Sequence, residues 1–212
     1  MTGTGVLVCR GGLDVSPLRE MLKEGDRPFC AGLHLDLDEF FRFDETGRYG
    51  TSVSDLPEGW EDVFTRHESS IAKSIESQLE ILRSKELPAS YLDGHHNTHL
   101  LLPVLNLVLP LMRRYGIARM RFAPGFYGSA EDVGRAREMM GYYGVISSDS
   151  FADLGDIMAG RFNPAPGDAG ALEVMAHPDL ADEYPDRLLQ FRYLEGGALS
   201  GYELISWTDH HP

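Results

Sequence analysis

The sequence predicts an α/β protein, a single-domain distorted (β/α) barrel of about seven strands spanning residues 1–212. Three observations lead to this fold class. Short apolar runs alternate with helical patterns along the chain, which is typical of parallel strands joined by right-handed crossovers. No linker, repeat or low-complexity segment interrupts the alternation. With 212 residues, the chain is long enough for one sizeable core and short for two.

The first half of the chain contains three expected strands and two helices. An apolar run over 5–9 predicts the first strand, and a serine-proline start predicts a short helix over 16–24. A second strand over 29–37 precedes the longest helical pattern, 57–87. A third strand is expected over 89–93. The long helix is recognised by apolar residues at helical spacing, namely Val63, Ile71, Ile75, Leu79 and Leu82.

The second half continues the alternation. A helix over 101–115 is ended by Gly116, a residue that readily adopts the left-handed conformation of a helix end. A loop rich in proline, glycine and alanine, 163–170, leads into a late strand. The remaining elements are expected as strands over 117–122, 145–147, 171–176 and 203–206, and as helices over 130–140 and near Arg187.

Charge and hydropathy exclude several classes of partner. The net charge of −14 disfavours nucleic acid and anionic membranes, because no basic stripe offsets it. No segment resembles a secretion signal, and the longest apolar stretch, 100–112, is too short to span a bilayer. We therefore expect a cytoplasmic protein in which Cys9 and Cys30 are reduced, buried thiols. A homodimer is compatible with this composition.

Residues 93–99, which read DGHHNTH, are the strongest functional signal. They place three imidazoles and a carboxylate between an expected strand and an expected helix. Imidazole is the commonest neutral metal ligand near pH 7, and a neighbouring carboxylate either binds the metal or orients a ligand. Packing alone rarely requires three histidines within five residues. The segment therefore favours metal or acid/base chemistry over a solvated loop.

Other polar residues fall at the carboxyl ends of expected strands, where a parallel barrel carries its working residues. They are His34, the pair Asp93 and His95, Arg121, and His177. The shared position predicts one common site.

Each of these residues also has a structural interpretation. A strand histidine such as His34 is often a core residue with one hydrogen-bond partner. His177, fixed before a proline, is either a general acid or a loop histidine. Arg121 could reach a substrate oxygen or pair with Glu173, an inward-facing acid. Two loop aspartates and three other histidines are interpreted as solvated, namely Asp36, Asp38, His67, His210 and His211.

Together these residues resemble the YdjC-like carbohydrate deacetylase family, which includes the chitooligosaccharide deacetylases. The resemblance rests on GLHL at 32–35, DGHHNTH at 93–99, RFAP at 121–124, and PG at 166–167 leading to EVMAHP at 173–178. The order and spacing of these motifs fit from about residue 29 to the C-terminus.

The resemblance implies a distorted (β/α) barrel that hydrolyses an N-acetyl group from an amino sugar, its small-molecule substrate. It also implies a divalent ion, zinc or magnesium, held by an aspartate and two histidines, which match His34 and His95 here. The histidine-rich set favours zinc. His99 is a reserve ligand, because it follows His95 by four residues. His177 matches the family's general acid, and Arg121 is a candidate substrate-binding residue.

The sequence departs from the family at two places. Asn97 stands where a further histidine is usual, and Gly11 and Gly12 stand where the first strand carries paired aspartates. Asp14 is the nearby carboxylate that could replace them as third ligand, and Asp14 or Asp93 could act as the base.

Three functions remain open at this point. The first is a metal-dependent N-deacetylase. The second is a degenerate barrel that acts in binding or regulation, which the lost aspartates favour. The third is a hydrolase or transferase in which Cys9 is the nucleophile and a histidine its base.

Overall fold

The computed structural model describes residues 3–8, 14–23, 29–41, 52–162, 170–176, 189–190, 192–194, 196 and 203. The chain forms two compact units, Met1–Ser147 with Ile205–Pro212, and Ser148–Leu204. Because two such units can belong to one domain, the single-domain expectation stays a prediction.

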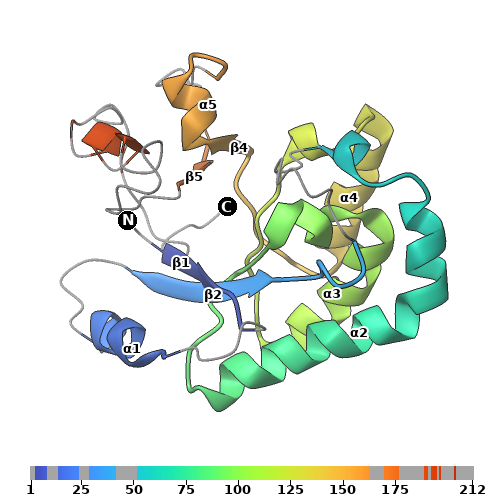
Figure 1. Ribbon diagram of the computed structural model, residues 1–212, viewed down its shortest axis with the longest axis horizontal. Coiled ribbons are helices and arrows are strands. Elements are labelled where there is room, and N and C mark those ends of the chain that lie inside the picture. The colour runs from blue at the N-terminus through green and yellow to red at the C-terminus, as the bar shows by residue number, and fades with distance from the viewer. Residues whose placement is uncertain are drawn as a thin grey trace. The chain divides into compact units, whose positions relative to one another are not determined.

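The first unit is built on a parallel sheet with the order β1-β2-β3 (Figure 1). Its strands are β1 (Gly3–Val6), β2 (Cys30–Leu35) and β3 (Leu92–Gly94). The register places His34 opposite Asp93. Two isolated parallel bridges, Leu92 with Met120 and Arg119 with Ile146, continue the arrangement beyond β3. The carboxyl ends of β2 and β3 therefore meet at one edge.

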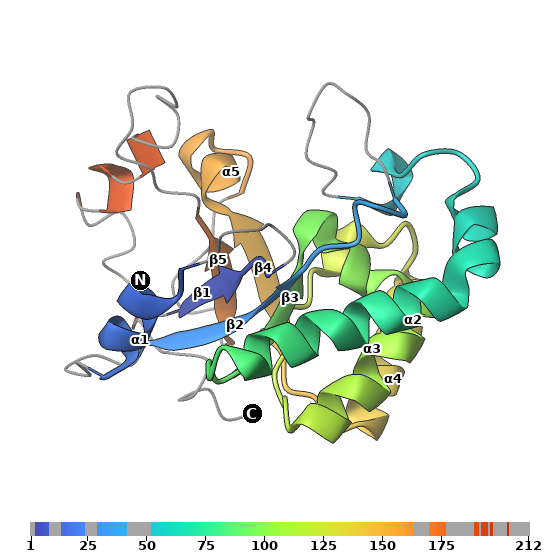
Figure 2. The same cartoon turned by 60° about the horizontal axis from the view of Figure 1, so that its bottom comes forward.

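The helices of this unit occupy the expected places. They are α1 (Ser16–Lys23), α2 (Trp60–Ser84), α3 (Leu102–Tyr115) and α4 (Ala130–Tyr142), with short 3₁₀ helices η1 (Val53–Asp55), η2 (His95–Leu100) and η3 (Pro124–Phe126). Helices α2, α3 and α4 lie side by side (Figures 1 and 2). α3 ends at Gly116, which has a φ of 72°, as the sequence predicted.

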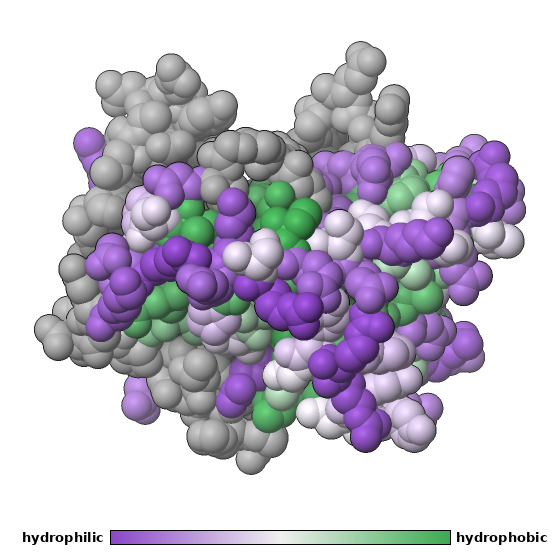
Figure 3. Space-filling model, turned by 90° about the horizontal axis from the view of Figure 1, so that it is seen from below, coloured by the Kyte–Doolittle hydropathy of each residue, from purple (hydrophilic) through white to green (hydrophobic). Residues whose placement is uncertain are grey.

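The core of the first unit lies between β2 and the inner sides of α2 and α3. The apolar spacing predicted for α2 is confirmed, because Ile71, Ile75, Leu79 and Leu82 are buried. The face that α2 crosses is mostly hydrophilic over the described residues (Figure 3). None of the described helices has both the length and the apolar character needed to cross a lipid bilayer.

The second unit contains a two-stranded parallel sheet of β4 (Ser150–Asp153) and β5 (Leu172–Met175), and the short helix α5 (Leu154–Met158). The Asp153 side chain accepts a hydrogen bond from the Gly155 N–H at 2.6 Å and so caps α5. β5 confirms the strand expected over 171–176. β4 and α5 were not predicted, since four residues are too few for a clear pattern.

The predicted class, α/β with parallel strands, is confirmed, but the barrel of seven strands is not found. The described residues form sheets of three and two strands. Two of the expected strands, 117–122 and 145–147, are reduced to isolated bridges. β3 ends after three residues because the chain turns into η2 at His95. The last expected strand, 203–206, lies almost wholly outside the described residues.

Gly32 offers a direct test of the packing between β2 and the chain before β3. A Cβ atom at Gly32 would lie 2.6 Å from the Tyr91 carbonyl oxygen and 2.7 Å from the Tyr91 ring. Since backbone cannot move aside easily, Gly32→Ala should lower the free energy of unfolding by about 1–3 kcal/mol. Urea unfolding at pH 7 measures this. Gly125→Ala, with open space around its Cβ, should cost little; equal costs would contradict the packing described here.

Candidate active site

His34 and Asp93 form the centre of the candidate site. Parallel pairing of β2 with β3 sets them opposite each other, and His34 Nδ1 lies 2.9 Å from Asp93 Oδ1. The Asp93 carboxylate is an acceptor only, so Nδ1 of neutral His34 donates the proton. This leaves the lone pair on Nε2. The His34 side chain keeps 20% of its surface exposed, whereas that of Asp93 keeps 4%.

The other oxygen of Asp93 is held by a buried arginine. Arg121 NH2 lies 2.8 Å from Asp93 Oδ2, and the Arg121 side chain is 6% exposed. Burial alone would raise the pKa of Asp93, but the Arg121 charge and then the His34 hydrogen bond outweigh it and lower the pKa to about 2. Asp93 is therefore an anion with both oxygens engaged. The sequence suggested a substrate oxygen or Glu173 as the partner of Arg121. In the structure the Arg121 charge is paired with Asp93 instead.

Two glycines allow the backbone to approach this network closely. A Cβ atom at Gly5 in β1 would lie 2.9 Å from Asp93 Oδ1 and 3.0 Å from the His34 Cβ. A Cβ atom at Gly94 would lie 2.5 Å from Nδ1 of His99. Glycine at both positions thus permits the dense packing that keeps Asp93 away from water.

His99 belongs to the same buried network. Its ring is fully buried, and Nε2 donates to the Arg121 carbonyl oxygen at 3.2 Å. Burial lowers the pKa of His99, and the Arg121 charge lowers it further, to about 3. The ring is therefore neutral at pH 7. His99 was expected as a reserve metal ligand. Because its Nε2 is hydrogen-bonded to the Arg121 carbonyl oxygen, the ring stabilises the packing around Arg121.

The backbone of η2 brings two neighbouring histidines together. His96 has φ 53° and Asn97 has φ 55°, a left-handed conformation that non-glycine residues seldom adopt. The rings of His95 and His96 stack with centroids 4.0 Å apart. The His95 ring centroid lies 5.6 Å from that of His34. The spacing of His95 and His99 therefore does not give a shared α-helical face, since α3 begins only at Leu102.

Asp38, from the loop after β2, completes a second group of polar residues. Its two oxygens lie 3.9 Å from His95 Nδ1 and 3.9 Å from His96 Nε2. Potential ligand atoms of these three residues all lie within 4.8 Å of one another, so they could hold a metal ion. Sequence reasoning interpreted Asp38 as a solvated carboxylate and gave His96 no role. Asn97 was an available signal, because asparagine is enriched in the left-handed region.

The other residues singled out in the sequence lie away from the His34 and Asp93 network or outside the described residues. Asp14 is exposed, and its Oδ1 accepts the Ser16 N–H at 2.9 Å at the start of α1. This hydrogen bond is the main cause that lowers the pKa of Asp14. His67 on α2 is exposed, as predicted, and Cys30 is buried. Other predicted positions, Cys9, Gly11, Gly12, His177, His210 and His211, lie outside the described residues.

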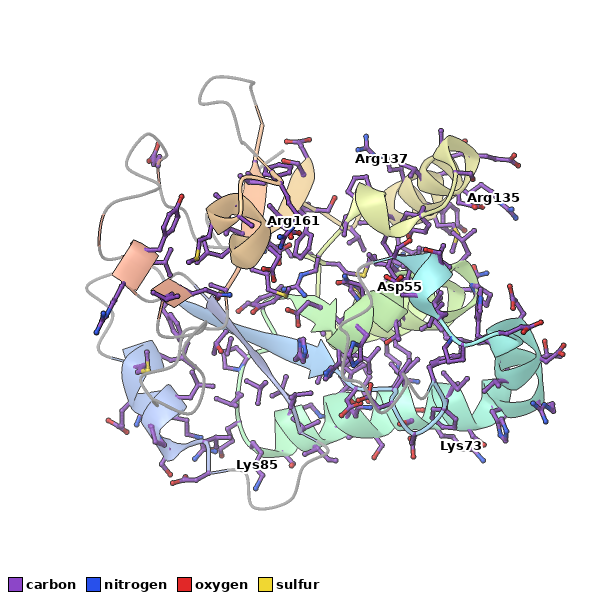
Figure 4. The ribbon with its side chains drawn as sticks, turned by 45° about the horizontal axis from the view of Figure 1, so that its top comes forward. Asp55, Lys73, Lys85, Arg135, Arg137 and Arg161 are labelled. Atoms are coloured by element: carbon purple, nitrogen blue, oxygen red, sulfur yellow. The ribbon has the colours of Figure 1, made fainter. Side chains whose placement is uncertain are left out.

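Arg121 is buried, whereas other cationic side chains of the first unit are exposed on its surface. Lys73 on α2 and Arg135 on α4 point away from the protein (Figure 4). The Arg135 side chain is 62% exposed, and its contact with Asp132 is a surface pair. Such pairs contribute little, so these residues serve as controls for the buried pair.

Comparisons with known proteins agree with this architecture. The family described as YdjC-like protein matches residues 8–202. Among solved structures, the chain is similar to a protein from Enterococcus faecalis V583 that is provisionally described as a cellobiose-phosphate cleavage protein. The TM-score is 0.58 at 16% identity, over 98% of this chain and 87% of the other. No curated protein matches at a significant level. The structural likeness, at this identity, shows the fold alone.

Proposed function

Because the chain belongs to the YdjC-like protein family, we propose that it is a metal-dependent hydrolase that removes an N-acetyl group from an amino sugar. The family relation supports a carbohydrate substrate. The description of the Enterococcus faecalis protein also refers to a carbohydrate, cellobiose phosphate. The observation that carries the proposal is the position of His34. It is oriented by a buried anion and lies beside the Asp38, His95 and His96 group.

The residues present fit a divalent metal ion. Two imidazoles and one carboxylate can approach a common point, and the nitrogen-rich set favours zinc over magnesium. Burial, and then the neighbouring His95, lower the pKa of His96, which keeps this ring neutral at pH 7. When bound, such an ion would polarise the acetyl carbonyl and acidify a water molecule.

His34 is the residue of this group best suited to accept a proton from water. Its Nδ1 proton is directed at Asp93, so Nε2 carries the free lone pair. The Asp93–Arg121 pair fixes the orientation of the His34 ring. Asp93 itself is a poor base, because its pKa is about 2 and both oxygens are engaged. We thus assign Asp93 to positioning, in place of the base that the sequence suggested.

The leaving amine requires a general acid. The resemblance assigns this role to His177, which lies outside the described residues, and we retain the assignment as part of the proposal. Asp14 receives no catalytic role here, because its carboxylate is exposed and caps α1. The preferred substrate is uncharged, since the protein carries a net charge of −14 and Arg121, the candidate substrate-binding residue, is already neutralised by Asp93.

The proposal is tested by acetate release from N-acetylglucosamine oligomers. We expect His34→Ala to lower the rate by about two orders of magnitude, because it removes the proton acceptor. The metal content should remain that of the wild type. His67→Ala, on the exposed side of α2, should keep the full rate.

Two outcomes would contradict the assignment. Equal rates for His34→Ala and wild type would exclude His34 as the base. A wild-type protein that binds these oligomers without releasing acetate would favour the binding function that Gly11 and Gly12 suggest.

A further inference from the structure

We propose that an aromatic hollow beside the candidate active site binds an uncharged sugar ring, the neighbour of the N-acetyl sugar that is hydrolysed. The hollow has a volume of about 230 Å³. It is lined by Glu39, Phe40, Phe41, Pro57, Trp60 and Val63. The inference rests on the proposed function for the identity of the reacting sugar, but sugar binding in the hollow can be measured without the reaction.

Both walls of the aromatic hollow belong to the connection between β2 and α2. The first wall follows directly after Asp38, whose two oxygens each lie 3.9 Å from a ring nitrogen of η2. Consecutive Cα atoms are about 3.8 Å apart, so the Cα atom of Phe40 is at most about 8 Å from that of Asp38. The hollow therefore lies after the carboxyl end of β2, close enough to the candidate site for the next ring of an oligosaccharide.

The start of α2 supplies the opposite wall. Gly59 has a φ of 80° and turns the chain into the helix, so that Trp60 is its first residue. Trp60 and Val63 are three positions apart and therefore lie on the same side of α2. Both side chains are partly exposed. An indole ring is thus placed beside apolar side chains in a position that a ligand can reach.

The first wall is supported by hydrogen bonds to α2. The Ser74 hydroxyl donates to Glu39 Oε1 at 2.8 Å. Gln78, which is 2% exposed, accepts the Asp36 N–H at 3.0 Å and donates to the Asp36 carbonyl oxygen at 2.6 Å. Phe41 is 1% exposed and forms the base of the hollow. A binding surface that is ordered before the ligand arrives loses less entropy when it binds.

The lining residues match the chemistry of an uncharged sugar. A pyranose ring has apolar C–H groups on its faces and hydroxyl groups around its edge. The C–H groups are attracted to the electron-rich faces of aromatic rings such as Phe40 and Trp60. The exposed Glu39 carboxylate can accept hydrogen bonds from hydroxyl groups, and it disfavours a sugar phosphate. The volume is below the roughly 300–1,000 Å³ of pockets for drug-sized ligands, which suits a single ring.

The first test follows the fluorescence of Trp60 in the full-length protein. The chain has two tryptophans, Trp60 and Trp207, so Trp207→Phe leaves Trp60 as the only indole emitter. The trisaccharide of N-acetylglucosamine should change the Trp60 emission at a lower concentration than the monosaccharide does, because only the trisaccharide can occupy the hollow and the reacting position together. No acetate release is needed for this readout.

Variants then assign the binding to the aromatic hollow. In equilibrium dialysis, Trp60→Ala should weaken trisaccharide binding about tenfold and Phe40→Leu about threefold, because each removes an aromatic face. Trp60→Phe keeps such a face and should lose less than Trp60→Ala. Tyr142→Ala on α4 is the matched control, since it removes an aromatic ring that is 80% exposed outside the hollow, and it should bind like the wild type. Circular dichroism and thermal unfolding confirm that each variant is folded.

The outcomes separate the hollow from the proposed hydrolysis. Trisaccharide binding that depends on Trp60 and Phe40, without acetate release, would support the hollow as a sugar site and refute the hydrolysis. Acetate release with unchanged trisaccharide binding in both variants would overturn the sugar site and leave the hydrolysis in place. Equal losses for monosaccharide and trisaccharide in Trp60→Ala would also overturn it, because the hollow would then hold the reacting sugar itself. A Trp60 emission that responds to tetramethylammonium chloride but not to the trisaccharide would identify a cation site instead.

Discussion

Arg121→Met is expected to lower the free energy of unfolding by about 3–5 kcal/mol at pH 7. Arg121 is the cation that compensates Asp93, and the side chains of both are nearly inaccessible to water. Removal of the guanidinium leaves an ionised carboxylate buried with one hydrogen bond from His34, and a buried charge without its partner is costly. Methionine keeps most of the side-chain volume, so the loss measures charge more than packing. Urea unfolding followed by circular dichroism gives the value.

Two further variants separate the charge from other effects. Asp93→Asn combined with Arg121→Met removes both charges, and the amide oxygen can still accept from His34, so the double variant should regain part of the loss. Arg135→Met on α4 removes an exposed arginine and should stay within about 0.5 kcal/mol of the wild type. If Arg121→Met costs no more than Arg135→Met, the buried pair does not stabilise the protein.

The sequence predicted the grouping of His34, Asp93 and His95 correctly. The reason is general, because carboxyl ends of neighbouring parallel strands meet at one edge of a sheet. Alternation of apolar runs therefore sufficed to place residues 34 and 93 near each other, although 59 positions separate them. It also predicted the helices α1 to α4, since each carries a clear apolar spacing or a terminal signal.

Other parts of the site could not be predicted in this way. Asp38 reaches His95 because residues 37–41 turn back on themselves, with the N–H groups of Phe40 and Phe41 donating to the Leu37 carbonyl oxygen. No glycine or proline marks that turn. The strand expected over 117–122 placed Arg121 near Asp93, but the sequence offered a substrate oxygen or Glu173 as its partner. The ion pair between Arg121 and Asp93 depends on the burial of both side chains, which no sequence pattern shows. Burial beside a charge also changes chemistry. With Arg121 and His34 bonded to it, Asp93 has a pKa of about 2 and is too weak a base for the role that the sequence suggested.

Acidification is expected to destabilise the protein well before its carboxylates titrate, through His99. The ring is neutral and fully buried, with Arg121, Asp93 and His34 as its charged or titratable neighbours. Its pKa in the folded protein is about 3, below the value of 6.5 expected when unfolded, so the unfolded chain binds a proton first. Stability is therefore complete above pH 6.5 and falls as the pH decreases towards 3. The slope from one such proton is at most about 1.4 kcal/mol per pH unit.

His99→Gln tests this expectation, because glutamine does not titrate and its amide can still donate to the Arg121 carbonyl oxygen. Urea unfolding of both proteins at pH 7, 6 and 5 should show a shallower loss of stability in the variant. The loss should persist in part, since the pKa of His96 is also lowered. Asp93, with a pKa of about 2 in the folded protein, adds its own loss only below about pH 4 and so leaves this window clear. His67→Gln, altered on an exposed helix face, should follow the wild type. Equal slopes for His99→Gln and the wild type would mean that His99 is protonated or accessible to water, and the buried network around Arg121 would then need a different charge assignment.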